Sequence, residues 1–595
     1  MFKGLKFLLK YCWSFDKWYI ICIISSQFIS AVSPLLFIII PKFILDELMN
    51  QKRSIVLFLY ILILVGTNII ISILANLLNG QAFLHKSKAF VQFQIFLSEK
   101  MALADYDQLE NPDFLDKREK ANKFIFADGQ GFAEVIDQAA NIIGKVFVFL
   151  GVITIISTLN ILIVIIFVVL VLLSTYIDSK AKKANVKLNL EKAPYERRGN
   201  YFSNLLSDYS YGKEIRLWNI KDWLINKYEA QLEENQMFYR KSVKNNCRSF
   251  NYNALISFVQ QAIVYVFLCY QVISDNIGIG SFTMYLNAAN TFSNAMKDVL
   301  GSIVNIRQYS IYYEALVEYM NVKQEIRTGN KDIIDPTDNY KIEFCNVSFK
   351  YPGQSWYSVR NINLTIKSGE KLSIVGENGA GKTTFIKLLM RLYDPSDGVI
   401  LLNGKDIKDI DYDQYLSLFS AVFQDFKLIS LSTKENVTLK DSDIEKDEVV
   451  KEILIKAGLP QKYIEDVNLY IHKDFGENGI EPSGGEGQKL ALARALYRTF
   501  YKKSEFIILD EPTAALDPRA EYEIYQQFNN IVNGKTAVFI SHRLSSSRFC
   551  DKIAVFQHGE IIEYGNHREL IKKDGIYKEL YSMQSQYYND NHNYM

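Results

Sequence analysis

The chain has 595 residues, and its 67 Lys and Arg nearly balance its 66 Asp and Glu, which leaves a net charge of +1. Without an overall basic excess, no nucleic-acid partner is expected. The low counts of Gly (30) and Pro (11) exclude collagen-like and low-complexity disordered chains. The six cysteines form no CxxC pair, which argues against a disulfide scaffold or a cysteine-rich zinc site.

The N-terminal half contains long apolar runs. A helix of about 20 apolar residues crosses a bilayer, and six segments have that character, near residues 18–40, 55–78, 135–157, 159–177, 254–273 and 282–305. The third and fourth are separated only by Thr158-Leu159-Asn160, which predicts a tight helical hairpin. A buried helical core of a soluble protein is the alternative, and six segments of spanning length argue against it. The sequence therefore predicts an all-α, six-helix transmembrane domain over residues 18–310, embedded in a lipid bilayer.

The Lys and Arg residues of the loops indicate orientation. The loop after the second segment is basic, and the loop after the fourth holds fifteen Lys and Arg between Lys180 and Arg248. We therefore expect both loops, the N-terminus and the C-terminal half to face the cytoplasm. Residues 1–17 are amphipathic and predict a cytoplasmic interfacial helix rather than a cleaved signal peptide.

Helical periodicity continues through both basic loops. Each loop is expected to form a helical hairpin that projects from the bilayer, with tips near residues 111–114 and 209–213, where Pro112 and Gly212 favour a break. The alternative is solvated loops of no special role. A docking function is favoured because of the domain that follows.

A polar linker, residues 311–340, separates the two halves. After it, short β-branched runs alternate with helical stretches, which is the α/β pattern. The sequence predicts an α/β P-loop NTPase domain over residues 341–585 and a tail over residues 586–595.

A glycine-rich loop lies between a predicted buried strand at residues 372–375 and a helix at residues 385–393, and it matches G-x4-G-K-[ST]. The backbone N–H groups of such a loop point at phosphates, and the helix N-terminus adds its positive dipole end. We expect Lys382 to reach the β- and γ-phosphates of ATP and the Thr383 hydroxyl to ligate Mg²⁺. The residues expected to hold the nucleotide here are Gly376, Glu377, Asn378, Gly379, Ala380, Gly381, Lys382, Thr383 and Thr384.

A second buried strand, residues 506–509, ends in two acids. Asp510 is expected to hold Mg²⁺, directly or through water. Glu511 is placed to accept a proton from the attacking water or to orient it. A helix cap is the alternative, but α/β sheets bind ligands at the carboxyl ends of their strands, which favours a catalytic site.

The run Ser483-Gly484-Gly485-Glu486 precedes a helix and predicts a second anion-binding helix N-terminus. One nucleotide does not obviously need two such sites in one chain. Two chains packed head to tail do, because each would contribute one element to each ATP.

In combination these motifs resemble those of ATP-binding cassette (ABC) exporters, in particular the bacterial half-transporters with six spanning helices and one nucleotide-binding domain per chain. The resemblance covers essentially the whole chain. It implies an ATPase coupled to transport in the cell membrane, with the nucleotide-binding domain in the cytoplasm. Residues near 111–116 and 207–216 resemble the two coupling helices.

The resemblance also implies residue roles. Tyr351 matches the aromatic residue that stacks on adenine, and Gln424 matches the Q-loop residue that links Mg²⁺ to the membrane domain. Ser483 to Glu486 match the signature, with Ser483, Gly484 and Gly485 touching phosphate, and residues 476–479 resemble the X-loop. Asp517 matches the D-loop residue, and His542 matches the switch histidine that contacts the γ-phosphate. Glu511 and His542 are the expected catalytic pair.

The signature departs from the usual Leu-Ser-Gly-Gly-Gln by having Pro482 and Glu486. Proline is tolerated just before a helix, whereas the glutamate adds negative charge beside a triphosphate. Because Glu511 and His542 are both present, a homodimer with two competent sites is the economical interpretation. Pairing with a different half-transporter is the alternative.

Polar residues inside the spans are candidates for the substrate path. They are Asn68, Gln138, Asn141, Gln260, Gln261, Asn287, Asn290 and Asn294. The last three share one helix face and either line that path or form interhelical hydrogen bonds. With no charge expected deep in the last two spans, an amphipathic or apolar solute (a peptide, a lipid or a drug-like molecule) fits best. An importer on the same fold and a non-transporting ATP-gated regulator are the other functions considered.

Overall fold

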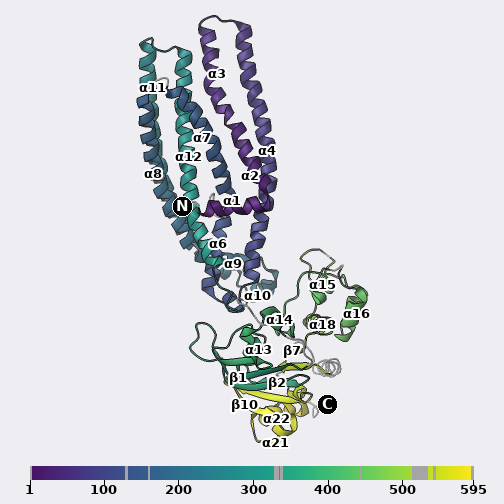
Figure 1. Cartoon of the computed structure of the whole chain (residues 1–595). Helices are drawn as coiled ribbons and strands as arrows, with labels where there is room; N and C mark the ends of the chain where they lie inside the picture. Colours follow the sequence, from purple (N-terminus) through teal and green to yellow (C-terminus); the bar gives the residue numbers. More distant parts are fainter. Residues whose placement is uncertain are drawn as a thin grey trace. The chain divides into compact units, whose positions relative to one another are not determined.

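The computed structural model describes residues 3–126, 131–157, 161–326, 334, 339–441, 444–476, 478–511, 534–540 and 544–590. The chain divides into two compact units. The first comprises Met1–Ala104 and Asn111–Lys323 and is helical, and the second comprises Asp105–Glu110 and Gln324–Met595 and is α/β (Figure 1).

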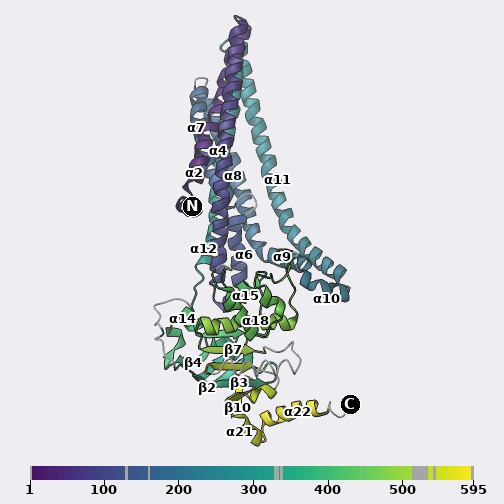
Figure 2. The same cartoon turned by 90° about the vertical axis from the view of Figure 1, so that its right-hand side faces the viewer.

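Long helices build the helical unit. They are α2 (Lys17–Ser30), α3 (Val32–Met49), α4 (Ser54–Ala102), α7 (Phe132–Ser157), α8 (Ile161–Glu191), α11 (Lys221–Ile273) and α12 (Ile279–Met320). With 49 residues, α4 is about 74 Å long, and α11 with 53 residues is longer still. Both are therefore far longer than a bilayer core is thick. Figure 2 shows these two long helices from the side.

Within the described part of the chain, five helical segments are long and apolar enough to cross a membrane. They are Lys17–Met49, Ser54–Ala102, Glu134–Ser157, Leu162–Glu191 and Lys221–Ile273. The first, second and fifth predicted spans fall in these segments, as do the described parts of the third and fourth. The sixth falls on α12, which is long enough but less apolar, so its membrane crossing stays a prediction.

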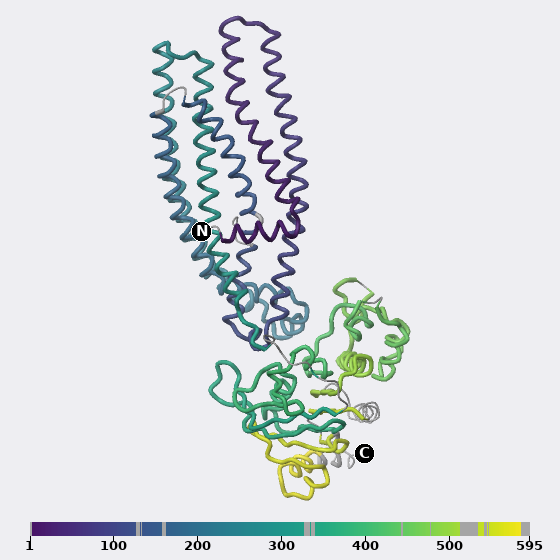
Figure 3. The backbone as a smooth tube through the Cα atoms, in the orientation of Figure 1, coloured from purple at the N-terminus to yellow at the C-terminus, as the bar shows by residue number. Residues whose placement is uncertain are grey.

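Shorter helices complete this unit. α1 (Lys3–Phe15) runs crosswise to the long helices and is apolar along one side, as an interfacial helix requires (Figure 3). The others are α6 (Pro112–Phe126), α9 (Ala193–Ser207), the 3₁₀ turn η1 (Tyr209–Tyr211) and α10 (Gly212–Leu217). The second predicted tip thus coincides with η1 and the start of α10.

The core of the bundle forms around α12, which packs against α7, α3 and α8. Phe292 of α12 is fully buried, and its ring lies 4.9 Å from that of Phe149 on α7. Buried alanines on α12 (Ala288, Ala289 and Ala295) let the neighbouring helices approach closely.

Two predicted boundaries are wrong. α12 continues to Met320, so the limit placed at residue 310 falls inside a helix. The first tip is also earlier than expected, because the short helix α5 (Tyr106–Leu109) forms it and Pro112 already begins α6. Proline suits the first turn of a helix, which explains why it starts α6 rather than marking the tip. The predicted 158–160 hairpin lies outside the described residues.

The α/β unit contains two sheets. The larger has the order β10-β9-β3-β8-β7-β6 and is parallel except for its β10 edge. Its strands are β3 (Lys371–Gly376), β6 (Phe419–Val422), β7 (Phe506–Asp510), β8 (Thr536–Ile540), β9 (Lys552–Gln557) and β10 (Glu560–Gly565). The smaller is antiparallel, with the order β2-β1-β4-β5, from β1 (Lys341–Phe349), β2 (Val359–Lys367), β4 (Asp397–Leu402) and β5 (Lys405–Asp406).

Helix α13 (Lys382–Leu389) joins the two sheets through a shared core. Its Phe385 stacks on Phe344 of β1 at 4.6 Å and meets Phe556 of β9 edge-on at 5.6 Å. The other helices are α14 (Tyr412–Ser417), α15 (Thr433–Thr438), α16 (Asp447–Lys456), α17 (Gln461–Glu465), α18 (Gly484–Tyr501), α20 (Leu544–Ser547), α21 (His567–Lys572) and α22 (Ile576–Asp590). This packing fixes α13 at the carboxyl end of β3, where parallel sheets bind ligands.

Candidate functional site

The glycine-rich loop takes a backbone path that side chains would obstruct. Gly376 has φ +150° and Gly381 has φ +99°. A Cβ atom on Gly376 would lie 2.2 Å from the carbonyl oxygen of Phe556, and one on Gly381 would lie 2.6 Å from that of Ser358. These glycines therefore allow the loop to wrap tightly between β3 and α13.

Lys382 lies at the first position of α13, and its side chain is buried. Its Nζ donates to the carbonyl oxygens of Gly376 at 2.9 Å and Glu377 at 2.8 Å. Burial lowers the pKa of Lys382, while the nearby carboxyl groups of Glu511 and Asp510 act in the opposite direction. The ammonium is thus held inside the loop, where an incoming phosphate would meet it.

A pocket of about 500 Å³ surrounds this loop. Of the predicted residues, it brings together Asn378, Gly379, Gly381, Lys382, Thr383, Thr384, Gln424 and Glu511. Other lining residues were not predicted, namely Trp356, Tyr357, Ser358, His558 and Gly559. His558 and Gly559 reach the pocket through the β9–β10 turn, whose place beside β3 no local sequence pattern reveals. The aromatic pair Trp356 and Tyr357 could have been predicted to lie near the nucleotide, because it follows Tyr351 so closely in the sequence.

Asp510 ends β7 and is 1% exposed. Neither carboxylate oxygen has a hydrogen-bond partner among the described residues. Burial, with the charge of Glu511 second, raises the pKa of Asp510 to about 6. A buried carboxylate beside the Thr383 hydroxyl fits the oxygen donors that Mg²⁺ prefers when phosphates supply the remaining ligands.

Glu511 follows directly and has a left-handed backbone with φ +49°. Its amide donates to the carbonyl oxygen of Ile540 at 3.0 Å, which ties the end of β7 to the end of β8. Its half-buried side chain lines the phosphate pocket. Asp517 and His542 lie outside the described residues, so their roles stay predictions.

Tyr351 is not among the lining residues of the phosphate pocket; it lines a second pocket together with Asp105, Gln108 and Tyr393. Its hydroxyl is 3.1 Å from Oγ1 of Thr384, and its ring meets that of Tyr393 edge-on at 5.4 Å. Tyr393 in turn meets Tyr106 of α5 at 5.5 Å, and its hydroxyl donates to Glu110 at 2.5 Å. The residues of the first tip therefore contact the aromatic group beside the predicted adenine position.

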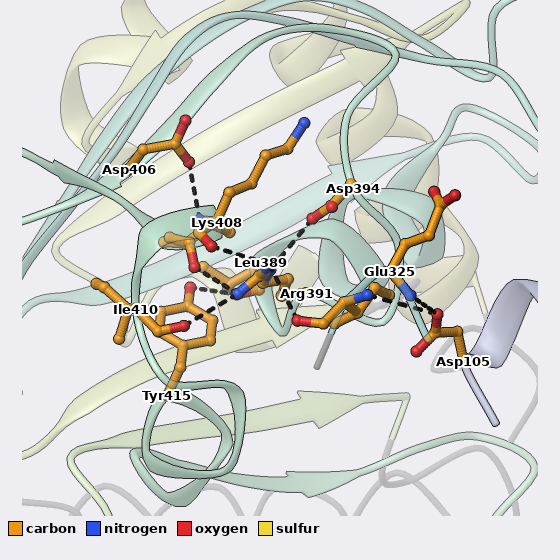
Figure 4. Close-up of polar contacts among 11 residues, drawn as sticks. Asp105, Glu325, Leu389, Arg391, Asp394, Asp406, Lys408, Ile410 and Tyr415 are labelled. Carbon is orange, nitrogen blue, oxygen red and sulfur yellow. Dashed lines mark hydrogen bonds and ion pairs between the residues drawn. The ribbon is translucent and has the colours of Figure 1, made fainter. Parts of the chain in front are cut away.

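A second set of contacts joins the same tip to the start of the α/β unit. Oδ2 of Asp105 accepts from the amides of Glu325 at 2.6 Å and Ile326 at 3.4 Å. The fully buried guanidinium of Arg391, just after α13, donates to the carbonyl oxygens of Ile326 and Ile407, among others, and to Asp394 (Figure 4). Arg391 thus connects the end of α13 with Ile326, whose amide donates to Asp105.

The signature forms the N-terminus of α18. Ser483 is the N-cap, and its Oγ accepts from the Glu486 amide at 3.2 Å while Oε2 of Glu486 accepts from the Ser483 amide at 2.9 Å. This reciprocal capping box orders the turn. Ser483 and Gly484 are exposed, and no signature residue lines the phosphate pocket of the same chain.

In the helical unit, two of the predicted polar residues make interhelical contacts. Asn68 accepts from Ser33 at 2.9 Å, and Gln260 donates to Ser293. Oε1 of Gln138 is buried without a partner among the described residues, Asn141 is half-buried and Gln261 is exposed.

The asparagine stripe on α12, formed by Asn287, Asn290 and Asn294, lacks such interhelical contacts among the described residues. All three side chains are exposed and make no hydrogen bond within the described part of the chain. The expectation that no charge lies deep in the last two spans is wrong, since Lys297 donates to Ser257 at 2.6 Å and Asp298 pairs with Lys145 at 2.9 Å. Each charged group has a polar partner, which is how charges are accommodated within such helices.

Comparisons with known proteins agree with this picture. Residues 359–514 match the ABC transporter family model. The chain is 29% identical to the subtilin transport ATP-binding protein SpaT of Bacillus subtilis, with 94% of this chain and 90% of SpaT covered. It is 27% identical to the nisin transport ATP-binding protein NisT of Lactococcus lactis, with 98% and 96% covered.

A more partial match is the ATP-dependent lipid A-core flippase of Alcanivorax borkumensis, 31% identical over 58% of this chain and 59% of the flippase. Among solved structures, a bacterial Atm1-family ABC exporter with ATP bound has the same fold, with a TM-score of 0.71 at 20% identity. It covers 95% of this chain and 98% of that one. The predicted fold class, helical membrane unit followed by nucleotide-binding unit, is confirmed.

Proposed function

We propose that this multi-pass membrane protein, an ATP-driven exporter of the ATP-binding cassette type, moves an amphipathic peptide out of the cytoplasm as a dimer of two identical chains. ATP binding and export follow from the family match and the relatives. The peptide cargo, the hydrolysis step, Mg²⁺ and the dimer are the parts proposed here.

The position of the signature carries the dimer proposal. The phosphate pocket contains the loop lysine, Gln424 and Glu511 from one chain but no signature residue. The exposed N-terminus of α18 therefore has anion-binding groups that its own chain's pocket does not use. A second copy packed head to tail would bring its Ser483 and Gly484 to the γ-phosphate held by Lys382, so that ATP joins the two chains.

The residues of the pocket have distinct tasks. Lys382 and the loop amides bind the β- and γ-phosphates, and Thr383, Gln424 and Asp510 are proposed to hold Mg²⁺, which would supply charge neutralisation at those phosphates. Glu511 orients the attacking water and accepts its proton, and His542 is proposed to contact the γ-phosphate. Tyr351, whose hydroxyl meets Thr384 of the pocket, is proposed to stack on adenine.

Export then follows from alternating access. ATP draws the two α/β units together, and the contacts of residues 105–110 with Tyr393 and with the chain at Glu325 carry that movement toward α4 and α6. Hydrolysis releases the γ-phosphate contacts, and the units separate.

Two observations favour a peptide. The relatives that match over nearly their whole length are named for the transport of subtilin and nisin. The exposed asparagine stripe on α12 offers both amide donors and carbonyl acceptors, which complement a peptide backbone. Unpartnered amides are costly against lipid, so the stripe is proposed to face the transport path.

The test is transport in proteoliposomes with ATP outside and a fluorescent amphipathic peptide. Wild-type protein should accumulate peptide in the lumen of vesicles with outward-facing nucleotide units, and the Glu511→Gln variant should not. ATP-dependent depletion of preloaded peptide from these vesicles would indicate an importer, and ATP hydrolysis without peptide movement would indicate a regulator.

A further inference from the structure

The carboxylate of Glu486 lies in the first turn of α18, among the groups proposed to bind the partner copy's ATP. It has two consequences that oppose each other. Its Oε2 holds the Ser483 amide and so helps to order the turn. Its negative charge, however, repels the triphosphate that the same turn is proposed to bind.

Lys462 lies directly against this charge. Its Nζ is 2.7 Å from Oε1 of Glu486, and the neighbouring Tyr463 donates its hydroxyl to Oε2 at 3.3 Å. The two contacts therefore engage both carboxylate oxygens. Lys489, a cation within α18 itself, is already committed to the carbonyl oxygen of Gly458 at 2.8 Å.

Tyr463 fixes the place of Lys462. Its ring is fully buried in the core that also contains Val450, Leu454 and Leu490. Because Tyr463 and Lys462 are consecutive residues of α17, this anchor holds the lysine backbone in position, while the lysine side chain remains 47% exposed. The cation is thus delivered to the signature by a rigid element of a different helix.

The arrangement also sets the direction of the Ser483 hydroxyl. Its oxygen already accepts from the Glu486 amide. The hydroxyl proton is therefore left to donate outward, toward an anion in front of the helix.

We propose that Lys462 is a positioning residue of the ATP site, which neutralises Glu486 so that this carboxylate orders the signature without repelling the partner copy's ATP. The inference rests on the proposed function, since it requires the signature to meet a phosphate. Glu486 replaces a neutral glutamine in the usual motif, and Lys462 is the compensation that this chain provides.

The test is a double-mutant cycle of Lys462→Met and Glu486→Gln, with steady-state ATP hydrolysis measured at low and high salt. Lys462→Met should raise the KM for ATP about threefold to fivefold at low salt with little change in kcat, and added salt should shrink the effect. In the Glu486→Gln background the same lysine substitution should have no effect on KM. Lys462→Arg should retain the wild-type KM.

Lys456→Met is the matched control. Lys456 pairs with Glu452 at 2.6 Å on α16, with similar geometry but within one exposed helix surface. This variant should keep the wild-type KM. Thermal unfolding of every variant separates a lost fold from a lost charge, and Lys462→Arg reports on the charge if Lys462→Met unfolds.

An unchanged KM in folded Lys462→Met, or a KM defect that persists with Glu486→Gln, would overturn the inference. If Lys462→Met leaves the KM unchanged while the wild-type protein hydrolyses ATP normally, only the role of Lys462 is refuted and the exporter proposal is unaffected. Wild-type protein that binds ATP without hydrolysing it would refute the proposed function instead.

Discussion

The hydroxyl of Tyr393 donates a 2.5 Å hydrogen bond to the carboxylate of Glu110, while its ring meets Tyr351. Burial, followed by this hydrogen bond, raises the pKa of Tyr393 well above its usual value, so the hydroxyl stays protonated. One side chain thus touches both the first tip and the aromatic residue proposed to bind adenine. Tyr393 is therefore proposed as a physical route between the adenine position and the tip.

Tyr393→Phe should weaken that route. The variant keeps the ring contacts but loses a hydrogen bond to a charged group, which costs about 1.5–3 kcal/mol at most. We expect peptide stimulation of ATP hydrolysis to fall severalfold while basal hydrolysis persists, measured in proteoliposomes. Tyr501→Phe, which removes a 3.0 Å bond to Glu452 on the surface, should leave stimulation intact. Equal stimulation in both variants would refute the route.

Glu511→Gln should abolish turnover but retain ATP. The amide has the size of the carboxylate but cannot accept the proton of the attacking water, and general-base loss costs about 10²–10⁴ in rate. ATP affinity, measured by equilibrium binding, should stay within about threefold of wild type. Lys382→Ala should instead lose binding. Hydrolysis at a near-normal rate in Glu511→Gln would remove this residue from the mechanism.

Acid should weaken the contacts of Glu486. Burial raises the pKa of Glu486, but the bonds from Lys462 and the Ser483 amide outweigh this and hold the pKa below its usual range. The folded state therefore favours the ionised form. The stabilisation is present above the unfolded pKa near 4.5 and is lost as pH falls through the lowered folded value.

Glu486→Gln should remove this dependence. The Tm difference between wild type and Glu486→Gln should shrink as the pH is lowered from 6 to 3, as followed by thermal unfolding. A constant difference across that range would show that the ion pair adds nothing.

Substitutions in the asparagine stripe are predicted to reduce transport without lowering stability. Asn290→Leu and Asn294→Leu should reduce peptide transport about twofold to tenfold, from the loss of one amide contact each, with little change in Tm. Asn68→Leu is the contrasting variant, because it breaks the internal bond with Ser33 and should lower Tm instead. Transport losses that simply follow Tm in all three variants would contradict a cargo-lining role.

The features that could be predicted are those that depend on residues close together in the sequence. The glycine pattern, Lys382 and the acids after β7 follow from the strand–loop–helix sequence, and the structure gathers Lys382, Thr383 and Glu511 in one pocket. The β9–β10 turn at His558 was not predictable, because it depends on strand order in the sheet. The partner of Glu486 was missed for a similar reason, since Lys462 is distant in sequence and only the packing of Tyr463 delivers it.

In the helical unit, too, local sequence predicted some features, and others depended on packing between distant residues. Hydropathy located the long apolar helices but placed the end of the last one too early, because α12 becomes polar well before it ends at Met320. The helical spacing of Asn287, Asn290 and Asn294 predicted that they share one face of the helix. It did not predict that this face is exposed. Lys297 and Asp298 were overlooked, and their partners Ser257 and Lys145 come from other helices.

The central claim is that ATP joins two copies of the chain, and native mass spectrometry of the Glu511→Gln variant with ATP and Mg²⁺ tests it directly. One spectrum gives both the number of chains and the number of nucleotides. We predict a two-chain particle with two ATP molecules, which Ser483→Ala should weaken. A single chain that retains ATP on its own, with no two-chain species at any ATP concentration, would contradict the account.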